Sequence, residues 1–334
     1  MAPPFRLLFV SDTHLGFDDP QQPRVERRRR GPDFLANLER ALLPALRGEV
    51  DAVLHGGDLF HRSEPPLALV ERGFQCLTRV AEAGVPVFVV PGNHERSKLP
   101  FPLLALHRNV FVFDKPRTFT LPGGIALSGF PYAHDVRARF RGLFAETGHA
   151  QQPASLRLLC VHQAVEGARV GTPEFVFRDG DDVIRGRDLP EGFAAVLSGH
   201  IHRGQRLCRG LDGRPFPAPF FYPGSVERTS FAERHEKKGY LILRFSEGLV
   251  KHDFYELPTR PLVRLQLESG LSDAALRARF AALPEDAVVR VELSGPGLAA
   301  ERLRALAPRE MTLELAFSRE RANDGGTARI RTGE

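Results

Sequence analysis

Five short polar clusters, each directly after an apolar run, carry the residue types from which a metal site can be built. They are Asp12-Thr13-His14, Gly56-Gly57-Asp58, Gly92-Asn93-His94, Val161-His162 and Gly199-His200-Ile201-His202. Together they supply carboxylate, amide and imidazole donors, a set that suits two divalent metal ions held side by side. Because such ion pairs polarise and clamp phosphate groups, the chemistry expected of this chain is phosphoester hydrolysis.

The spacing within the clusters predicts how the donors converge. Residues two apart in a strand point to the same face, so Asp12 and His14 should meet at one point, as should His200 and His202. The apolar runs before the clusters are short and rich in β-branched or aromatic residues, as in strands buried on both faces. All five clusters are therefore predicted at strand carboxyl ends, where open α/β sheets bind ligands.

Each cluster alone also has a plainer interpretation. Gly-Gly-Asp and Gly-Asn-His are typical of tight turns, because glycine adopts positive φ and Asp caps a following helix. A single histidine such as His162 is more often a hydrogen-bonded core residue than a ligand, and only the Gly-His-Ile-His cluster is moderately specific by itself. Their joint order at the same end of successive predicted strands favours one shared site.

The order D-x-H, G-G-D-L-F-H, G-N-H-E, V-H-Q and G-H-I-H resembles the calcineurin-like metallophosphoesterase superfamily. Within that superfamily, the chain is similar to the SbcD and Meiotic Recombination Eleven family of DNA-repair nucleases. Four passages carry this closer likeness: S-D-T-H-L-G at 11–16, G-D-L-F-H at 57–61, Y-P-G-S-V-E-R at 222–228 and E-K-K-G-Y at 236–240. The likeness is strong over residues 5–255.

The resemblance implies a ligand role for seven matched residues. One ion would be held by Asp12, His14 and His202. The other would be held by Asn93, His162 and His200, with Asp58 bridging the two. The resemblance implies two Mn²⁺ ions as cofactors. A donor set of oxygen and imidazole without thiolate suits Mn²⁺ or Fe²⁺ better than a structural Zn²⁺ site, with Zn²⁺ as the alternative ion.

Two further histidines and one departure from the family pattern concern catalysis. By the resemblance, His94 is the catalytic histidine that stabilises or protonates the leaving oxygen. His61 would be a second histidine that helps to place DNA. The family usually has Asp where this chain has Glu95, so a hydrogen bond from that acid to a histidine would have to be rebuilt around one more methylene. The remaining nearby histidines, such as His55, have no matched role and are interpreted as structural.

Basic residues gather in the segments after three of the clusters. The net charge of +5 decides little by itself, but these segments should leave the same end of the sheet and rim the site with cations suited to backbone phosphates. The candidate DNA-binding residues are Arg27, Arg28, Arg29, Arg30, Arg96, Lys98, Arg203 and Arg206. The alternative is that the arginine run is a solvated loop. Because no base-reading motif is present, we expect contact mainly with phosphate and shape.

Hydrophobic periodicity predicts the fold class. Helical spacing over 32–46 and 65–83 between buried strands is typical of a layered α/β protein, and the resemblance implies a two-sheet α/β/β/α metallophosphoesterase sandwich. Residues 1–257 would form this nuclease domain, with a long loop at 166–189. Clean alternation in three later strands predicts a small βαβαβ cap domain over 258–318, which in the resembling nucleases helps to orient DNA. Residues 319–334 are polar and predicted to be disordered.

The composition indicates the general class of the protein and the cellular compartment expected for it. With 42% hydrophobic and 26% charged residues, the chain has the make-up of an ordinary globular protein. Its three cysteines are odd in number and lack metal-ligand spacing, which favours a reducing compartment. The first apolar stretch ends at Asp12 and is too short for a signal peptide or a membrane span, so a cytoplasmic location without membrane contact is expected.

These observations favour a Mn²⁺-dependent DNA nuclease, acting as an exonuclease, an endonuclease or both on ends or hairpins in double-strand-break repair. Two alternatives stay open. One is a small-molecule or cyclic-nucleotide phosphodiesterase or phosphatase of the same superfamily, and the other is a non-catalytic subunit that binds DNA ends. The expected partners are DNA ends, hairpins and single strands. An SbcC-like coiled-coil ATPase and a homodimer are further candidates, although the helices that usually dock such an ATPase are not evident.

Overall fold

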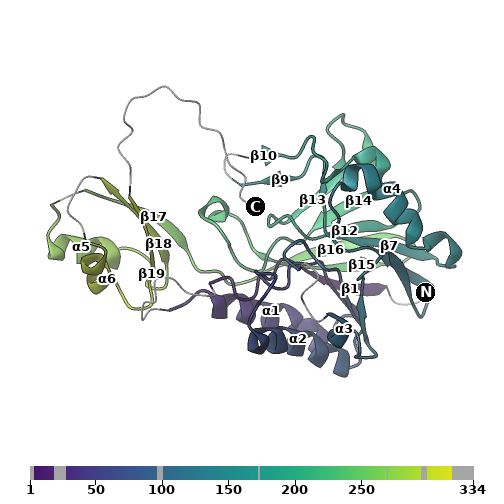
Figure 1. Ribbon diagram of the computed structural model, residues 1–334, viewed down its shortest axis with the longest axis horizontal. Coiled ribbons are helices and arrows are strands. Elements are labelled where there is room, and N and C mark those ends of the chain that lie inside the picture. The colour runs from purple at the N-terminus through teal and green to yellow at the C-terminus, as the bar shows by residue number, and fades with distance from the viewer. Residues whose placement is uncertain are drawn as a thin grey trace. The chain divides into compact units, whose positions relative to one another are not determined.

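The structure, a computed structural model, describes residues 4–18, 28–95, 101–171, 174–268, 270–294 and 299–317. The chain divides into two compact units (Figure 1). The first contains residues 1–24 and 29–259, and the second contains residues 25–28 and 260–334. All five polar clusters therefore belong to the first unit.

Two six-stranded mixed sheets form the frame of the first unit. The first sheet has the order β16-β15-β1-β2-β3-β4. Its strands are β1 (Phe5–Val10), β2 (Ala52–His55), β3 (Val87–Val89), β4 (Val110–Val112), β15 (Gly239–Phe245) and β16 (Leu249–Glu256). The second sheet has the order β13-β14-β12-β7-β6-β5. Its strands are β5 (Arg117–Leu121), β6 (Ile125–Gly129), β7 (Leu156–Val161), β12 (Ala195–Ser198), β13 (Gln205–Arg209) and β14 (Pro215–Tyr222).

Helices and short strands complete this unit. The helices are α1 (Gly31–Leu46), α2 (Leu67–Glu82), α3 (Phe101–Leu104) and α4 (Val136–Glu146), with 3₁₀ turns η1 (His149–Gln151), η2 (Gly186–Asp188) and η3 (Phe231–Glu233). The short strands are β8 (Ala164–Val165), β9 (Arg169–Val170), β10 (Phe175–Val176) and β11 (Val183–Ile184). The segment 166–189, expected to be a loop, thus contains three of these strands, because β9 pairs with β10 and β11 pairs with β8.

Alternating side chains of β1 show how the layers pack. Leu7 and Phe9 lie in a cluster shared with the second sheet, whereas Leu8 and Val10 lie in a cluster shared with α1 and α2. A third cluster joins the outer face of the second sheet to α4. Figure 1 shows α1, α2 and α3 along one side of the first unit and α4 on the opposite side. The predicted α/β/β/α sandwich is therefore confirmed.

The inner strands of both sheets run parallel. Strand β1 pairs in parallel with β2, and β2 with β3. In the second sheet, β7 pairs in parallel with both β6 and β12. Because the polar clusters come directly after β1, β2, β3, β7 and β12, they lie at the carboxyl ends of parallel strands, which is where this class of sheet binds ligands.

The second unit is a three-stranded parallel sheet with two helices. Its elements are β17 (Leu262–Glu268), α5 (Asp273–Ala281), β18 (Val288–Ser294), α6 (Ala300–Leu306) and β19 (Thr312–Phe317). Ser272 caps α5, since its side-chain oxygen accepts a hydrogen bond of 3.2 Å from the Ala275 backbone. The predicted disordered tail, 319–334, lies outside the described residues.

Two observations concern membrane-spanning helices and the state of the cysteines. No helix in the described part of the chain is both long and apolar enough to cross a bilayer. Cys76 and Cys160 are buried, Cys208 is exposed, and all three are free thiols.

A matched pair of leucines tests the packing between the sheets. Leu7 is fully buried between them, whereas Leu67 is 68% exposed. We predict that Leu7→Ala lowers the free energy of unfolding by about 2–5 kcal/mol, because it removes buried methylene groups and leaves a cavity. Leu67→Ala should change it by less than about 0.5 kcal/mol. Urea denaturation measures both, and equal losses would contradict the proposed packing.

Candidate metal centre

At the strand ends, unusual backbone conformations orient the polar side chains. Among the described residues, five non-glycine residues have positive φ, and four of these are candidate ligands: Asp12 (52°), His14 (41°), Asp58 (52°) and His200 (82°). Such conformations each cost about 1–3 kcal/mol and persist where surrounding packing enforces them. Four of the seven candidate ligands are therefore oriented by left-handed conformations after the strands. The expectation that strand alternation would orient them is wrong.

Hydrogen bonds across the two sheets draw the clusters together. His162 Nδ1 donates to the Gly56 carbonyl at 2.7 Å, and the His200 backbone N–H donates to Asp12 Oδ1 at 3.0 Å. Glycine is required at this approach, since a Cβ on Gly199 would lie 2.1 Å from Ser11 Oγ. The ends of five strands from both sheets thus meet in one small volume.

A first group of donors consists of Asp12, His14 and His202, whose ligand atoms all lie within 4.8 Å of one another. The Nε2 atoms of His14 and His202 face each other at 2.9 Å. Asp12 is fully buried, and its Oδ2 has no hydrogen-bond partner among the described residues. An ionised carboxylate oxygen without a partner is costly to bury, so this group calls for a cation.

A second group gathers around Asn93. Its side-chain oxygen lies 3.0 Å from His200 Nδ1 and 3.1 Å from His162 Nε2. Asp58 Oδ2 lies between the groups, 3.4 Å from His162 Nε2 and 3.9 Å from His14 Nε2. His200 and His202 consequently face different groups and do not form the single chelate that their spacing predicted.

The donor cluster has strongly perturbed pKa values. Burial opposes the charged form of His162, but Asp58 and Asp12 outweigh it and raise the pKa of this imidazole to about 9. Burial together with the nearby charge of His162 lowers the pKa of His200 to about 3. Burial also raises the pKa of Asp58, yet His162 and His14 hold it well below its usual range. Positive charge therefore stabilises the Asp58 carboxylate, whereas burial raises the pKa of Asp12.

The donor set and geometry fit two divalent cations. A partnerless buried carboxylate oxygen, two facing imidazole nitrogens and an amide oxygen between two imidazoles are all arrangements that cations satisfy. The backbone carbonyl of Gly56 accepts from Nδ1 of His162, which leaves the Nε2 lone pair of the neutral ring facing the site. Hard oxygen and imidazole donors suit Mn²⁺, Fe²⁺ or Zn²⁺.

His94 and His61 lie beside the two groups. His94 Nε2 is 3.9 Å from Asp58 Oδ2, and its backbone N–H donates to Asp58 Oδ1 at 3.0 Å. His94 Nδ1 donates to the His61 carbonyl at 2.6 Å, so the proton of the neutral ring is on Nδ1 and Nε2 faces the site. Burial and the adjacent His94 lower the pKa of His61 to about 4. The structure brings both predicted catalytic histidines to the donor cluster.

Glu95 holds two of the site loops together. Its carboxylate accepts hydrogen bonds from the backbone N–H groups of Leu59, Phe60 (3.1 Å) and Gly92 (2.9 Å). These groups flank Asp58 on one loop and Asn93 on the other. Burial and the charge of Asp58 raise the pKa of Glu95 to about 7. The longer acid at this position therefore bonds backbone amides, and no hydrogen bond from it to a histidine is formed among the described residues.

Several supporting residues carry no signal in the sequence. His202 Nδ1 lies 3.0 Å from Thr229 Oγ1 and 3.1 Å from Glu233 Oε1. The Tyr132 ring lies beside the His200 ring, with centroids 5.7 Å apart. His55, interpreted as structural, is fully buried and lies 3.1 Å from Thr13 Oγ1. Only the fold brings these side chains to the ligands.

The predicted basic rim is only partly formed by exposed cations. Arg27, Arg96 and Lys98 lie outside the described residues. Arg30 is a correction: it is 6% exposed, because its guanidinium packs over the Phe17 ring and bonds the Arg228 carbonyl. The remaining four predicted residues differ in their surroundings: Arg28 is in the second unit near Glu310, Arg29 pairs with Asp18, Arg203 pairs with Glu174, and Arg206 is exposed over Phe221.

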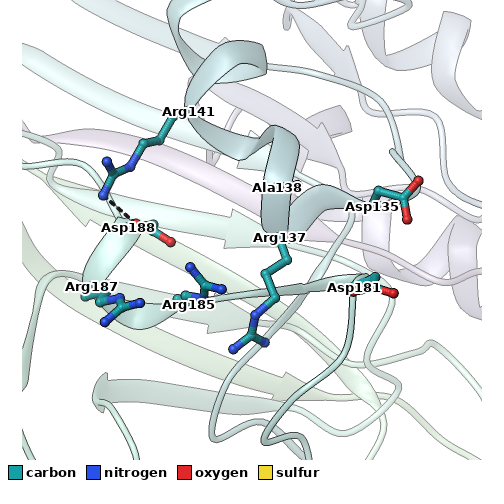
Figure 2. A pocket seen from close by; sticks show the side chains of 8 residues that line it. All are labelled: Asp135, Arg137, Ala138, Arg141, Asp181, Arg185, Arg187 and Asp188. Atoms are coloured by element: carbon teal, nitrogen blue, oxygen red, sulfur yellow. Dashed lines mark hydrogen bonds and ion pairs between the residues drawn. The ribbon is translucent and has the colours of Figure 1, made fainter.

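A separate hollow of about 670 Å³ lies beside α4 and η2, lined by four arginines and three aspartates (Figure 2). Arg141 forms an ion pair of 2.8 Å with Asp188, and Arg137 forms one of 3.1 Å with Asp179. None of the candidate metal ligands lines this hollow. The hollow is therefore not part of the metal centre.

The fold and the donor cluster together define the class of metal-dependent phosphoesterases. Comparison with known families agrees: residues 5–204 match the model of the calcineurin-like phosphoesterases. The chain belongs to this family. The resemblance indicated by the sequence motifs is thereby confirmed.

Curated relatives are similar to the chain over most of its length. A DNA double-strand break repair protein Mre11 of Haloferax volcanii is 32% identical over 87% of this chain. A protein of the same name from Methanosarcina acetivorans is 28% identical, also over 87%. The chain spans 62% and 46% of the length of these two relatives. The likeness to the Meiotic Recombination Eleven family is confirmed, while the relatives extend well beyond the matched part.

Solved structures were also compared with the chain. A dimetal phosphatase from Danio rerio covers 77% of this chain and 100% of its own, with 13% identity and a TM-score of 0.46.

Two glycines provide a test of the site's close packing. A Cβ on Gly92 would lie 2.2 Å from Asp58 Oδ1 and 2.6 Å from the Asp58 backbone nitrogen, whereas one on Gly142 in α4 would meet open space. We predict that Gly92→Ala displaces Asp58 and weakens Mn²⁺ binding, measured by titration calorimetry. Gly142→Ala should leave binding unchanged and stabilise the fold by about 1 kcal/mol. Unchanged binding in Gly92→Ala would contradict the geometry.

Glu95 gives a second test. Glu95→Gln removes the charge and places an amide N–H₂ against a backbone donor, so we predict a loss of about 1–3 kcal/mol in the free energy of unfolding. The exposed Glu82, at the end of α2, provides a control: Glu82→Gln should have little effect. Chemical denaturation in the presence of chelator measures both without a contribution from bound metal.

Proposed function

We propose that this protein is a Mn²⁺-dependent DNA nuclease. The observation that carries the proposal is the convergence of seven donor side chains from five strand ends in a chain similar to Mre11 proteins. In this proposal Asp12, His14 and His202 would hold one ion. Asn93, His162 and His200 would hold the other, and Asp58 would lie between them as a shared ligand. When bound, two such ions polarise a phosphate group and activate a water.

Residues of the protein orient the catalytic histidine, which transfers a proton to the leaving oxygen. His94 Nδ1 is fixed as a donor to the His61 carbonyl, so Nε2 faces the donor cluster. There Nε2 takes a proton from solvent and delivers it to the leaving oxygen. Its side chain is 34% exposed, which gives substrate access. His61 packs against His94, with ring centroids 5.5 Å apart, and limits its rotation. Glu95 keeps the Asp58 and Asn93 loops in register.

DNA is proposed as the substrate because the named relatives are DNA double-strand break repair proteins. Arg206 is exposed, and Arg203 lies beside the histidine cluster in sequence while paired with Glu174. These residues would contact backbone phosphate and would read no base sequence. The second unit would help to orient DNA. An SbcC-like ATPase and a second copy of the chain are proposed partners.

The test is digestion of labelled duplex ends, hairpins and single strands with Mn²⁺. We predict that His94→Gln binds Mn²⁺ and DNA but cleaves about 10²–10⁴-fold more slowly, because a positioned proton donor is lost. His107→Gln, which changes a histidine outside the donor cluster, should cleave at the unaltered rate.

Other outcomes favour the alternatives. Hydrolysis of bis-p-nitrophenyl phosphate or cyclic nucleotides without cleavage of any DNA would favour a small-molecule phosphodiesterase. DNA retention with no Mn²⁺-stimulated hydrolysis of either substrate would favour an end-binding subunit. Equal cleavage by His94→Gln and the unaltered protein would remove His94 from the mechanism.

A further inference from the structure

Two sequence passages that mark the chain's closer family likeness, 222–228 and 236–240, contain none of the candidate ligands. In the structure, residues from both passages contact the same ligand, His202. Lys238 and Ser225 bond its backbone carbonyl, and Glu233, between the passages, lies at its ring. A specific role for these residues can be derived from their contacts.

Lys238 is fully buried, and each of its ammonium protons has an acceptor. Its Nζ lies 2.8 Å from the His202 carbonyl, 2.7 Å from Glu233 Oε2 and 3.0 Å from Glu236 Oε2. The exposed fractions of the two carboxylate side chains are 10% and 12%. A buried ammonium is stable only when paired in this way, so the lysine and the two acids form one unit.

Glu233 connects this unit to the His202 ring. Its Oε1 accepts a hydrogen bond of 2.6 Å from Thr229 Oγ1 and lies 3.1 Å from His202 Nδ1. Since the single hydroxyl proton of Thr229 is used, both oxygens near Nδ1 can only accept. Nδ1 must therefore carry a proton. In the neutral ring, the free lone pair is then on Nε2, which faces His14 Nε2 at 2.9 Å.

The backbone of His202 is held from a second direction. Its carbonyl also accepts from the Ser225 N–H at 3.1 Å. Gly224 permits this approach: its φ is +80°, and a Cβ there would lie 2.8 Å from the His202 carbonyl oxygen and 2.7 Å from the Gly204 nitrogen. Both the main chain and the ring of His202 are thus fixed by residues later in the sequence.

We propose that Lys238 and Glu233 are positioning residues that fix the tautomer and orientation of His202, and so set the affinity of one of the two metal sites. This inference rests on the proposed function. The proposed role concerns one ion and not both, because none of the other candidate ligands bonds Lys238 or Glu233 among the described residues.

The experiment titrates Mn²⁺ into the metal-free full chain, with calorimetry for affinity and electron paramagnetic resonance for coupling between ions. Variants are Glu233→Gln and Lys238→Met. The control is Lys237→Met, because that neighbouring lysine has a side chain that is 73% exposed and pairs only with Glu256 among the described residues. Thermal unfolding of each metal-free protein is monitored by circular dichroism.

We expect the unaltered protein and Lys237→Met to bind two ions that give an exchange-coupled spectrum. Glu233→Gln and Lys238→Met should weaken one ion by about 10–100-fold and leave the other unchanged, with a mononuclear Mn²⁺ spectrum at intermediate metal concentrations. If Lys238→Met fails to fold, Glu233→Gln decides the question.

Two results would overturn the inference alone: both ions retaining full affinity in folded Glu233→Gln, or both weakening equally in step with a lower unfolding temperature. Binding of fewer than two ions by the unaltered protein would instead remove the proposed function, and the inference with it.

Discussion

The closeness of the two sheets at their carboxyl ends is the constraint on which the metal centre depends. The donors belong to strands of different sheets, so their distances are set by packing of the shared apolar layer, which includes Leu7 and Phe9 on one side and Leu158 and Leu197 on the other. Where the layer ends, Gly199 lies against Ser11 and Gly56. Any larger residue at Gly199 would move the second-sheet ligands relative to the first-sheet ligands.

Around that junction, the site combines strained backbone with hydrogen bonds that hold it. Asp12, His14 and Asp58 adopt left-handed conformations that isolated residues avoid. Their compensation is local: Asp12 N–H bonds the Gly57 carbonyl, His14 N–H bonds the Asp58 carbonyl, and Glu95 bonds the loop after Asp58. These hydrogen bonds hold the donors in position, so the protein itself preorganises the cluster.

Much of this arrangement could be predicted from the sequence, because it follows from the residue types and their order along the chain. Apolar runs predict strands, and parallel strands bring the residues after their carboxyl ends to one edge of the sheet, so the seven donors and His94 could be grouped together. The left-handed turns could not be predicted, because Asp and His adopt this conformation more often than most residues but still at only a few of their positions. Contacts of Lys238 with His202, 36 positions apart, exist only once the sheets have packed. Arg30 resembles its neighbours in an arginine run, and only the position of Phe17 shows that it is buried.

The central place of β1 has a consequence for biosynthesis. This strand, near the start of the chain, pairs on one edge with β2 and on the other with β15, with Phe5 opposite Phe245. During translation, its second edge must wait until more than two hundred further residues have left the ribosome. Contacts of such sequence separation form slowly. Nascent chains therefore carry an uncovered edge of an apolar strand until β15 has emerged, a state that favours chaperone engagement and disfavours early metal loading.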